Sequence, residues 1–556
     1  MKRQIDCLLI GHNEMDFEVY EQTCRKMGVY SGNYRDLNLN FLFYNNKPYT
    51  AAGMFNLLNN SLEAGFEPLT MGEPFSAAVS YLGSFLYKNG LQFDYVNSFQ
   101  ENKARLAELL VQENILTIAI ITTLYVLPLP IIEIVDFIRQ YNHTARIILG
   151  GPFVSTQVRT LEPEELVYLW NTIDADFFVN SPQGEATLVK IIKALKNQLP
   201  WDNIENIHYK MNGTYTAAPI KQEDNLLSDN PVNWNLFSQR IADYVNVRTA
   251  ISCPFSCSFC GFPQHAGKYQ TADVEWIDRQ LSHLDRLGVK SVHFIDDTFN
   301  VPVKRFKEIL TRMIAKKYRF KWHSYFRCQF ADRETIEMMK ESGCEGVFLG
   351  IESGSEQVLK NMNKQSSQKQ YLEGIARLNQ YGIVTFGSFI TGFPGETDET
   401  IKDTVKFIET SGLDFYRTQS WYCETITPIW KERLKYGIKG ERFEWSHETM
   451  NSKTACDRID EMFRSIKNSL WIPQYDFDFA SIWRLVHRGI PLKKVKDFLK
   501  GFKKGIEEKL LHPYHPEPSY EVLKEMGKVF QQEGDTGSLF NDEENPRDKY
   551  QVDFDF

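Results

Sequence analysis

Three cysteines stand close together near the middle of the chain, at a spacing that suits metal chemistry. Three residues separate Cys253 from Cys257, and two residues separate Cys257 from Cys260. Cysteine thiolates are the usual ligands of iron–sulfur clusters. Three of them can ligate three irons of a [4Fe–4S] cube and leave the fourth iron open for a substrate to bind and receive an electron.

Zinc and disulfides are the alternatives for these thiols. A structural zinc site needs four ligands, and the next candidates along the chain are the more distant His265 and Cys328. A disulfide framework would leave one of the three thiols unpaired. The other six of the nine cysteines are scattered through the chain, so we expect reduced thiols and a cytoplasmic protein.

The cysteine spacing, with Phe259 before the last cysteine, resembles the radical S-adenosylmethionine (SAM) superfamily. In that family the open iron binds SAM. The reduced cluster then cleaves SAM to methionine and a 5′-deoxyadenosyl radical. The resemblance therefore implies a [4Fe–4S] cluster, SAM and an external electron donor of the flavodoxin or ferredoxin type.

Composition excludes several other classes of function. The 556 residues are 42% hydrophobic and 24% charged, which is ordinary for a soluble globular protein of two to four domains. The net charge of −9 argues against nucleic-acid binding that depends on neutralising phosphates. We expect no membrane span and no signal peptide, because no apolar stretch is long enough.

The first 200 residues alternate between buried strands and amphipathic helices. Strands are predicted at 5–10, 93–96, 118–122, 145–149 and 176–179, and helices at 75–89, 102–113, 131–141 and 184–197. This pattern predicts an α/β fold, a doubly wound, flavodoxin-like parallel sheet, with residues 14–74 as an insertion. A helix near 16–27 and a strand over 39–43 are expected within the insertion. Ligands of such sheets bind at the carboxyl ends of the strands.

This region resembles the cobalamin-binding domain that precedes the radical module in one large branch of the superfamily. The resemblance rests on Gly150-Gly151-Pro152 after the fourth strand and Gly184-Glu185 at the start of the last helix. An ordinary flavodoxin-like domain with tight turns is the alternative. The residues expected to contact cobalamin are Thr122, Thr123, Leu124, Tyr125, Gly150, Gly151, Pro152, Ser181, Gly184 and Glu185.

His12 follows the first strand, where many cobalamin domains offer a histidine to cobalt. Ile10 and Met15 replace the Asp and Gly of that motif. We therefore predict that His12 does not ligate cobalt and that cobalamin is bound without its own base.

A second repeating pattern begins near Val247. Strands are predicted at 247–252, 291–295, 321–327, 346–351, 384–390 and 414–418, and helices at 273–287, 302–316, 332–342, 367–381 and 397–411. This is a partial (β/α)6 barrel of the radical SAM type, whose active site would lie at the carboxyl ends of the strands. The expected divisions are a cobalamin-binding domain over 1–200, a β-rich connector over 201–245, the radical SAM domain over 246–425, a helical domain over 426–530 and an acidic disordered tail over 531–556.

Polar residues and glycines at the ends of these strands suit a SAM site. Carboxylates can hold the ribose, a cation the carboxylate, and glycine-lined backbone the adenine. The expected SAM-binding residues are Phe259, Gly261, Asp297, Arg327, Glu352, Ser353, Ser388, Ile390 and Gly392. The alternative for Asp296-Asp297 is a helix cap, and the alternative for Glu352 is a surface ion pair. The aromatic residues Trp421, Tyr422, Trp430 and Trp445 could line a substrate mouth or belong to the core.

The resemblance implies a cobalamin-dependent radical SAM methyltransferase of the class B type. Its substrate would be an unactivated carbon, or a phosphinate phosphorus, of a small-molecule natural-product intermediate, and the segment Gly32–Asn38 is similar to the phosphinothricin-type P-methyltransferase group. Such chemistry suits inert positions because a radical needs neither an acidic proton nor a leaving group. Two alternatives stay open: a cyclase or rearrangement enzyme with the same cofactors, and a corrinoid-binding or cluster-binding protein without turnover.

Overall fold

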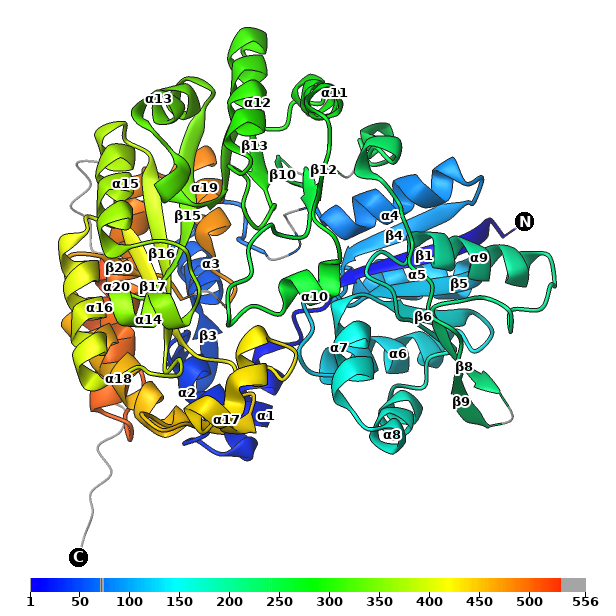
Figure 1. Cartoon of the computed structure of the whole chain (residues 1–556), viewed down its shortest axis with the longest axis horizontal. Coiled ribbons are helices and arrows are strands. Elements are labelled where there is room, and N and C mark those ends of the chain that lie inside the picture. Colours follow the sequence, from blue (N-terminus) through cyan, green and yellow to red (C-terminus); the bar gives the residue numbers. More distant parts are fainter. Residues whose placement is uncertain are drawn as a thin grey trace, which may run out of the picture.

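The computed structural model of the chain consists of two lobes, each built around a seven-stranded sheet. It describes residues 2–531 except 71, 73, 74, 212, 240, 242 and 474. The expected acidic tail, apart from Gln531, lies outside the described residues. Figure 1 shows the first sheet on the right and the second sheet on the left, with α10 (Phe262–Ala266) where the lobes meet.

The first lobe confirms the doubly wound sheet. Its strand order is β4-β1-β5-β6-β7-β8-β9, and the first five of these strands are parallel. Their bounds are β1 Gln4–His12, β4 Phe93–Ser98, β5 Asn114–Ile121, β6 Arg146–Gly150, β7 Phe177–Val179, β8 Ile207–Met211 and β9 Thr214–Ala217. The two last strands are antiparallel. Part of the expected connector therefore extends the first sheet.

Helices cover both faces of this sheet because its strands are apolar on both sides. Cys7 and Leu9 of β1 pack with α4 and α9, whereas Leu8 and Ile10 pack with α5, α6 and α8. The helix bounds are α4 Ala77–Lys88, α5 Lys103–Gln112, α6 Leu129–Tyr141, α7 Pro152–Thr160, α8 Pro163–Ile173 and α9 Glu185–Lys196.

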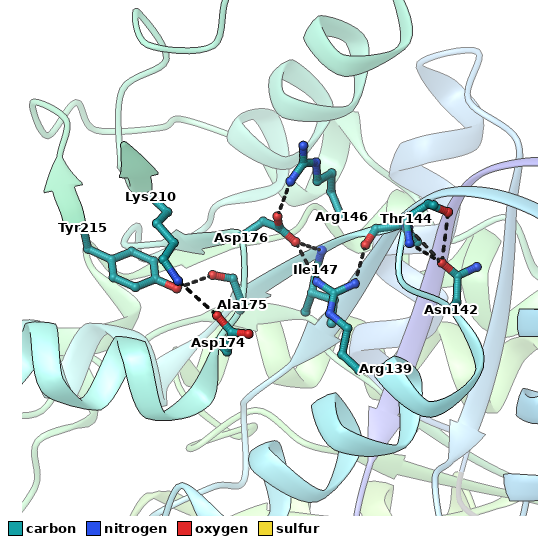
Figure 2. A network of polar contacts seen from close by, with 11 residues as sticks. Arg139, Asn142, Thr144, Arg146, Ile147, Asp174, Ala175, Asp176, Lys210 and Tyr215 are labelled. Atoms are coloured by element: carbon teal, nitrogen blue, oxygen red, sulfur yellow. Dashed lines mark hydrogen bonds and ion pairs between the residues drawn. The ribbon is translucent and has the colours of Figure 1, made fainter. Parts of the chain in front are cut away.

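The amino ends of β6 and β7 are held by a closed polar network (Figure 2). Asp176 accepts hydrogen bonds from Arg139 at 3.0 Å, Arg146 at 2.6 Å and the backbone N–H of Ile147 at 2.8 Å. Arg139 also donates to the carbonyl of Ala145 at 2.9 Å. Every charge in this group has a partner, so this edge of the sheet is structural.

The second lobe contains the expected barrel strands in parallel order and one more strand. The order is β10-β13-β14-β15-β16-β17-β20. The bounds are β10 Tyr244–Val247, β13 Ser291–Phe294, β14 Lys321–Phe326, β15 Cys344–Glu352, β16 Val384–Thr391, β17 Phe415–Ser420 and β20 Leu470–Trp471. The outer helices are α11 Val274–Arg286, α12 Val303–Lys316, α13 Arg333–Glu341, α14 Glu356–Asn361, α15 Gln368–Gln380 and α16 Asp398–Thr410.

Two predictions about this lobe were wrong in detail. The first barrel strand ends at Val247, and Ala250–Ile251 instead form β11, which pairs antiparallel with β12 Gln270–Thr271. The periodicity of this apolar run cannot show that it folds back as a hairpin. The region 454–512 is mostly helical, as expected, but it also supplies β20, which pairs with Phe415 and Tyr416 of β17.

The insertion belongs structurally to the second lobe. It contains α1 Phe17–Met27, α2 Gly32–Asn38, β2 Phe41–Tyr44, β3 Lys47–Thr50 and α3 Ala51–Ser61. Arg417 of β17 is buried and donates to Asn40 at 2.5 Å and to Asp36 at 3.2 Å. Lys509 donates to the carbonyls of Asn38 and Phe41, both at 2.6 Å. The insertion therefore lies against the barrel's last strand and the C-terminal helices, as Figure 1 also shows.

The C-terminal segments complete the second lobe. They are α17 Arg433–Tyr436, β18 Lys439–Glu441, β19 Glu444–Ser446, α18 Ser452–Ser465, α19 Phe479–His487, α20 Leu492–Leu511 and α21 Tyr520–Gly527. Phe479 and Trp483 of α19 pack against His323 of β14, with ring centroids 6.0 and 6.3 Å away. Among the described residues, no helix is long and apolar enough to cross a membrane.

Candidate cluster and SAM site

The cysteine loop leaves the hairpin strand β11 and is anchored at its base by Asp296. The Asp296 carboxylate accepts from the backbone N–H groups of Thr249 at 2.6 Å and Ala250 at 2.9 Å. Arg305 donates to the hydroxyl of the same Thr249 at 2.7 Å. Asp296 therefore caps no helix: it holds the strand that leads into the loop, while α12 begins only at Val303.

The three thiols are free and lie at the edge of the barrel. Cys257 is buried, and Cys253 and Cys260 are half-buried. No described group of three such side chains converges on one point as a single metal ion requires, whereas cluster ligands bind different irons and stand further apart. Burial raises the pKa of Cys253, and it raises the pKa of Cys260 to about 12. These thiols therefore keep their protons until a strong positive charge such as iron displaces them.

Arg327 connects the loop to the rest of the barrel. Its guanidinium donates to Cys257 Sγ at 3.2 Å and lies 3.6 Å from the centroid of the Phe255 ring. Its backbone is fixed by Asn300, which accepts from the Arg327 N–H at 3.0 Å and donates to its carbonyl at 2.8 Å. A cation beside a thiolate stabilises the ligand form of that sulfur.

Lys364 is a site residue that sequence reasoning missed. It is buried, donates to Glu352 Oε1 at 2.9 Å, and lies 5.4 Å from the centroid of Phe259. Its carbonyl accepts from Arg327 at 3.2 Å. Burial acts to lower the pKa of Lys364, but the charge of Glu352 outweighs it and raises that pKa. Lys364 lies between two helices, and no motif in the sequence marks it.

Glu352 forms an ion pair, but the pair is buried and does not lie on the surface. Strand β15 has an irregular register next to Glu352, whose φ is +70°. Backbone strain of this kind persists where surrounding contacts enforce it, and it is frequent at functional sites. The structure thus brings Glu352, Arg327 and Phe259 together around Lys364.

The other expected SAM residues are more widely placed. Asp297 is exposed to solvent, yet the protein atoms around it and the neighbouring Asp296 raise its pKa to about 7. Ser353 lies on the helix side of the sheet, 3.3 Å from the hydroxyl of Thr404. Ser388 and Ile390 are half-buried on β16.

Two glycines of the expected SAM site are required by close packing. Gly261 follows the last cysteine, and a Cβ there would lie 2.7 Å from Ile426 Cδ1. Gly392 has φ +92°, and a Cβ there would lie 2.4 Å from the Trp445 ring. The backbone N–H of Gly392 donates to Glu396, whose pKa burial raises to about 8.

The aromatic residues that follow the barrel differ in how deeply they are buried. Trp421 and Trp445 are buried, with ring centroids 5.1 Å apart, so they belong to the core. Tyr422 and Trp430 are half-buried.

The carboxyl edge of the first sheet contains the residues expected to bind cobalamin. Thr122 is buried and donates to the carbonyl of Gly150 from its backbone N–H at 3.0 Å and from its hydroxyl at 2.9 Å. Gly151 has φ +123°, and a Cβ there would lie 2.8 Å from Thr122 Oγ1. Thr123 and Leu124 are exposed beside this tight turn, and Pro152 begins α7.

Tyr125 is buried under His12. The two rings stack with centroids 5.2 Å apart, and the Tyr125 hydroxyl accepts from the backbone N–H of Asn13 at 2.7 Å. Burial lowers the pKa of His12 to about 4. The ring of His12 is therefore neutral and held flat against Tyr125.

Two further buried polar groups lie at this edge. The Ser181 hydroxyl is buried and has no hydrogen-bond partner among the described residues. Glu185 follows Gly184, the N-cap of α9 with φ +76°, and burial raises the pKa of Glu185 to about 7. Such groups are candidates for ligand contacts.

A cavity of about 530 Å³ lies next to the same edge. Val126 and Phe153 line one side, Tyr168 of α8 another, and Arg442 reaches it from the second lobe.

Loops at the carboxyl edge of the first sheet contact the second lobe. Tyr475 donates to the carbonyl of Glu14 at 3.3 Å, and Thr156 Oγ1 lies 3.3 Å from His265 Nε2. A Cβ at Gly267 would lie 3.6 Å from Pro182. The edge proposed for cobalamin thus faces the cysteine loop, which agrees with the position of α10 in Figure 1.

Comparison with known proteins finds a family model that matches part of the second lobe. Residues 248–408 match the model that describes the Radical SAM superfamily. An uncharacterised methyltransferase of Pyrococcus horikoshii is 30% identical over 285 residues, which cover 50% of this chain and 60% of that protein. The hopanoid C-2 methylase of Rhodopseudomonas palustris is 27% identical over 46% of this chain and 51% of the methylase. The chain thus spans about half to three fifths of these relatives.

Solved structures show the same fold over most of the chain. The cobalamin-dependent SAM radical enzyme OxsB aligns with a TM-score of 0.57 and 16% identity, covering 83% of this chain and 77% of OxsB. The radical SAM methyltransferase TsrM from Kitasatospora setae aligns with a TM-score of 0.57 and 15% identity, covering 78% of each chain. Residues 248–408 thus match the Radical SAM superfamily, and the solved structures show that the chain shares the fold of these two proteins over most of its length.

Proposed function

We propose that this chain is a cobalamin-dependent radical SAM methyltransferase that acts on an inert carbon, or a phosphinate phosphorus, of a small-molecule natural-product intermediate. The observation that carries the proposal is that segments at the carboxyl edge of the first sheet contact the segment after the cysteine loop, through Thr156 with His265 and Pro182 with Gly267. Two ligand-binding edges that face each other suit a reaction that needs both cofactors in one chamber.

The residues at each edge fit the groups that the family uses. Cys253, Cys257 and Cys260 would hold the cluster, and Arg327 donates to the sulfur of Cys257. Around SAM, Glu352 and Asp297 would accept from hydroxyl or ammonium groups. The turn of Thr122 with Gly151 and the free hydroxyl of Ser181 would receive the cobalamin ring. When bound, the cluster and SAM supply a 5′-deoxyadenosyl radical, and cobalamin supplies a transferable methyl group.

The chain's own contribution is to position these groups and to exclude water. Arg327, Lys364 and Glu352 form a connected buried network beside the loop, so their side chains are fixed before any ligand binds. α19 closes the amino end of the barrel with Phe479 and Trp483. The insertion covers the side at β17 through Arg417. Closure on these sides protects a radical from solvent.

Names among the relatives and structural neighbours support methyl transfer. The relatives include the hopanoid C-2 methylase and a bacteriochlorophyllide d C-12(1)-methyltransferase of Chlorobaculum tepidum, which is 29% identical over 37% of this chain and 46% of that enzyme. A second candidate is cyclisation or rearrangement with the same cofactors. It is favoured by the anaerobic magnesium-protoporphyrin IX monomethyl ester cyclase of Cereibacter sphaeroides, which is 25% identical over 45% of this chain and 43% of that enzyme.

The test is an anaerobic reaction of the reconstituted protein with SAM that carries a labelled methyl group. A one-electron donor of the flavodoxin or ferredoxin type, or a chemical reductant, starts the reaction. We expect stoichiometric cobalamin binding, formation of 5′-deoxyadenosine and, with the right substrate from a candidate panel, a product that carries the label. An unlabelled, rearranged product would support the cyclase. A protein that binds no cobalamin would contradict both, and Cys257→Ala serves as the inactive control.

A further inference from the structure

A short contact between α7 and α10 joins the two ligand-binding edges. Helix α7 begins at Pro152, directly after the turn of Gly150 and Gly151, and α10 begins directly after Gly261, the residue that follows Cys260. Figure 1 shows the two helices side by side where the lobes meet.

His265 of α10 reaches two hydroxyls in the first turns of α7. Its Nε2 lies 3.3 Å from Thr156 Oγ1, and its Nδ1 lies 3.5 Å from Ser155 Oγ. Thr156 donates its own hydrogen to the carbonyl of Pro152 at 2.9 Å. Thr156 can therefore only accept from His265, so Nε2 carries the proton and Nδ1 accepts from Ser155.

The chemistry of the ring agrees with this pairing. Burial, followed by the nearby charge of Arg159, lowers the pKa of His265 to about 4. A neutral imidazole has one donor and one acceptor, which are the two functions that the two hydroxyls need. An imidazolium would offer two donors and lose the bond from Ser155.

Arg159 and Pro182 add to the same contact. Arg159, near the end of α7, donates to the carbonyl of Gln264 in α10 at 2.5 Å. Gly267, which ends α10, approaches the ring of Pro182 in the loop after β7. The cysteine loop is therefore connected to two of the loops that would hold cobalamin, through a helix of only five residues.

We propose that His265 is a positioning residue that fixes the distance between the cluster with its SAM and the cobalamin edge of the first sheet. This inference rests on the proposed function. Reductive cleavage of SAM needs only the barrel site, whereas transfer of the SAM methyl group to cobalamin needs both edges in register. A misplacement of about 1 Å can slow such a transfer about a hundredfold.

The test compares these two reactions without any knowledge of the substrate. His265→Phe and Thr156→Val each remove one side of the contact. Thr160→Val is the matched control, because among the described residues its hydroxyl bonds only to the carbonyl of Thr156 in its own helix. His265→Gln keeps a donor near the position of Nε2. Iron and cobalamin contents are measured for every variant.

We expect His265→Phe and Thr156→Val to slow the transfer of labelled methyl from SAM to reduced cobalamin by at least about tenfold. Formation of 5′-deoxyadenosine should stay within about twofold of wild type. The double variant should be no slower than the slower single variant, since both changes break one contact. His265→Gln should recover most of the rate, and Thr160→Val should behave as wild type.

A second measurement uses the protein without cofactors. Amide hydrogen exchange over 152–160 and 262–266 should become faster in His265→Phe and should not change in Thr160→Val. Unchanged exchange, unchanged methyl transfer, or a parallel fall of both reactions would overturn the role of His265. A wild-type protein that binds no cobalamin would instead overturn the proposed function, and the role of the contact with it.

Discussion

The carboxyl edges of the two sheets are built differently, although both sheets are largely parallel. At the barrel edge, Arg327, Lys364 and Glu352 already satisfy one another and one cysteine sulfur. At the edge of the first sheet, the Ser181 hydroxyl has no partner among the described residues, and the raised pKa of Glu185 reflects a carboxylate that burial destabilises.

The opposite end of the first sheet shows that this difference is local. The Asp176 network in Figure 2 pairs every charge at the amino ends of β6 and β7. The charged groups of the Asp176 network are thus paired at the amino end of the sheet, whereas the Ser181 hydroxyl at the carboxyl end has no partner among the described residues. We infer that the barrel edge is organised before its ligands bind, whereas the edge of the first sheet is completed by its ligand.

The largest effect is expected at the three cysteines that we assign as ligands of the cluster. Cys253→Ala, Cys257→Ala and Cys260→Ala should each abolish the brown absorbance of the cluster and all cleavage of SAM. Cobalamin binding should persist, because the residues proposed to bind cobalamin lie in the first lobe. Iron analysis and 5′-deoxyadenosine measure the first two effects. Cys328→Ser is the control, and an equal loss of iron there would contradict the ligand assignment.

The next effect concerns the organised network at the barrel edge. Glu352→Gln leaves Lys364 buried without a counter-charge, which costs about 3–5 kcal/mol of stability. Thermal unfolding should show a lower midpoint, and Glu352→Gln combined with Lys364→Met should recover part of it. SAM should bind about tenfold to a hundredfold more weakly to Glu352→Gln, since a charge-assisted hydrogen bond contributes about 1.5–3 kcal/mol.

The same SAM titration on Arg327→Lys adds a test of the loop. Lysine keeps the charge but loses the planar contact with Phe255 and the paired donors. SAM affinity should therefore fall even where iron content is retained. Wild-type affinity in both Glu352→Gln and Arg327→Lys would contradict this placement of SAM.

A smaller effect is expected at the edge of the first sheet. Gly151→Ala places a Cβ 2.8 Å from Thr122 Oγ1 and forces a backbone conformation that only glycine adopts readily. Cobalamin affinity should fall about tenfold, while SAM cleavage stays unchanged. Gly213→Ala is the matched control, since it has φ +83° but open space around the added Cβ. Equal loss in both variants would indicate general strain instead of a cobalamin contact.

The smallest effect is expected at His12. Its ring is stacked on Tyr125 and lies in the sheet's own packing, so we predict that it does not bind cobalt. Electron paramagnetic resonance of the protein with cob(II)alamin should show no threefold splitting of the cobalt lines in wild type or in His12→Ala. A splitting that disappears in His12→Ala would show that His12 is the axial ligand.

The sequence by itself determined the local elements and the cysteine loop. Apolar runs such as Leu8 to Ile10 favour buried strands between two layers of helices, and three thiols at short spacing remain neighbours in any fold. The helix near 16–27 and most strands and helices of both lobes were predicted for this reason, whereas α7, α8 and the β11 hairpin were not. The local sequence pattern is sufficient to predict a feature whose interacting residues lie within one helical turn or one strand.

Only the tertiary structure decided which distant residues meet. Lys364 reaches Glu352 because the segment after α14 folds back under the cysteine loop. The insertion lies on the second lobe because Arg417 is buried and requires the carboxylate of Asp36. His265 meets Thr156 across 109 positions of sequence. These contacts depend on how whole sheets and helices pack, since burial and charge pairing are satisfied between elements that no local pattern brings together.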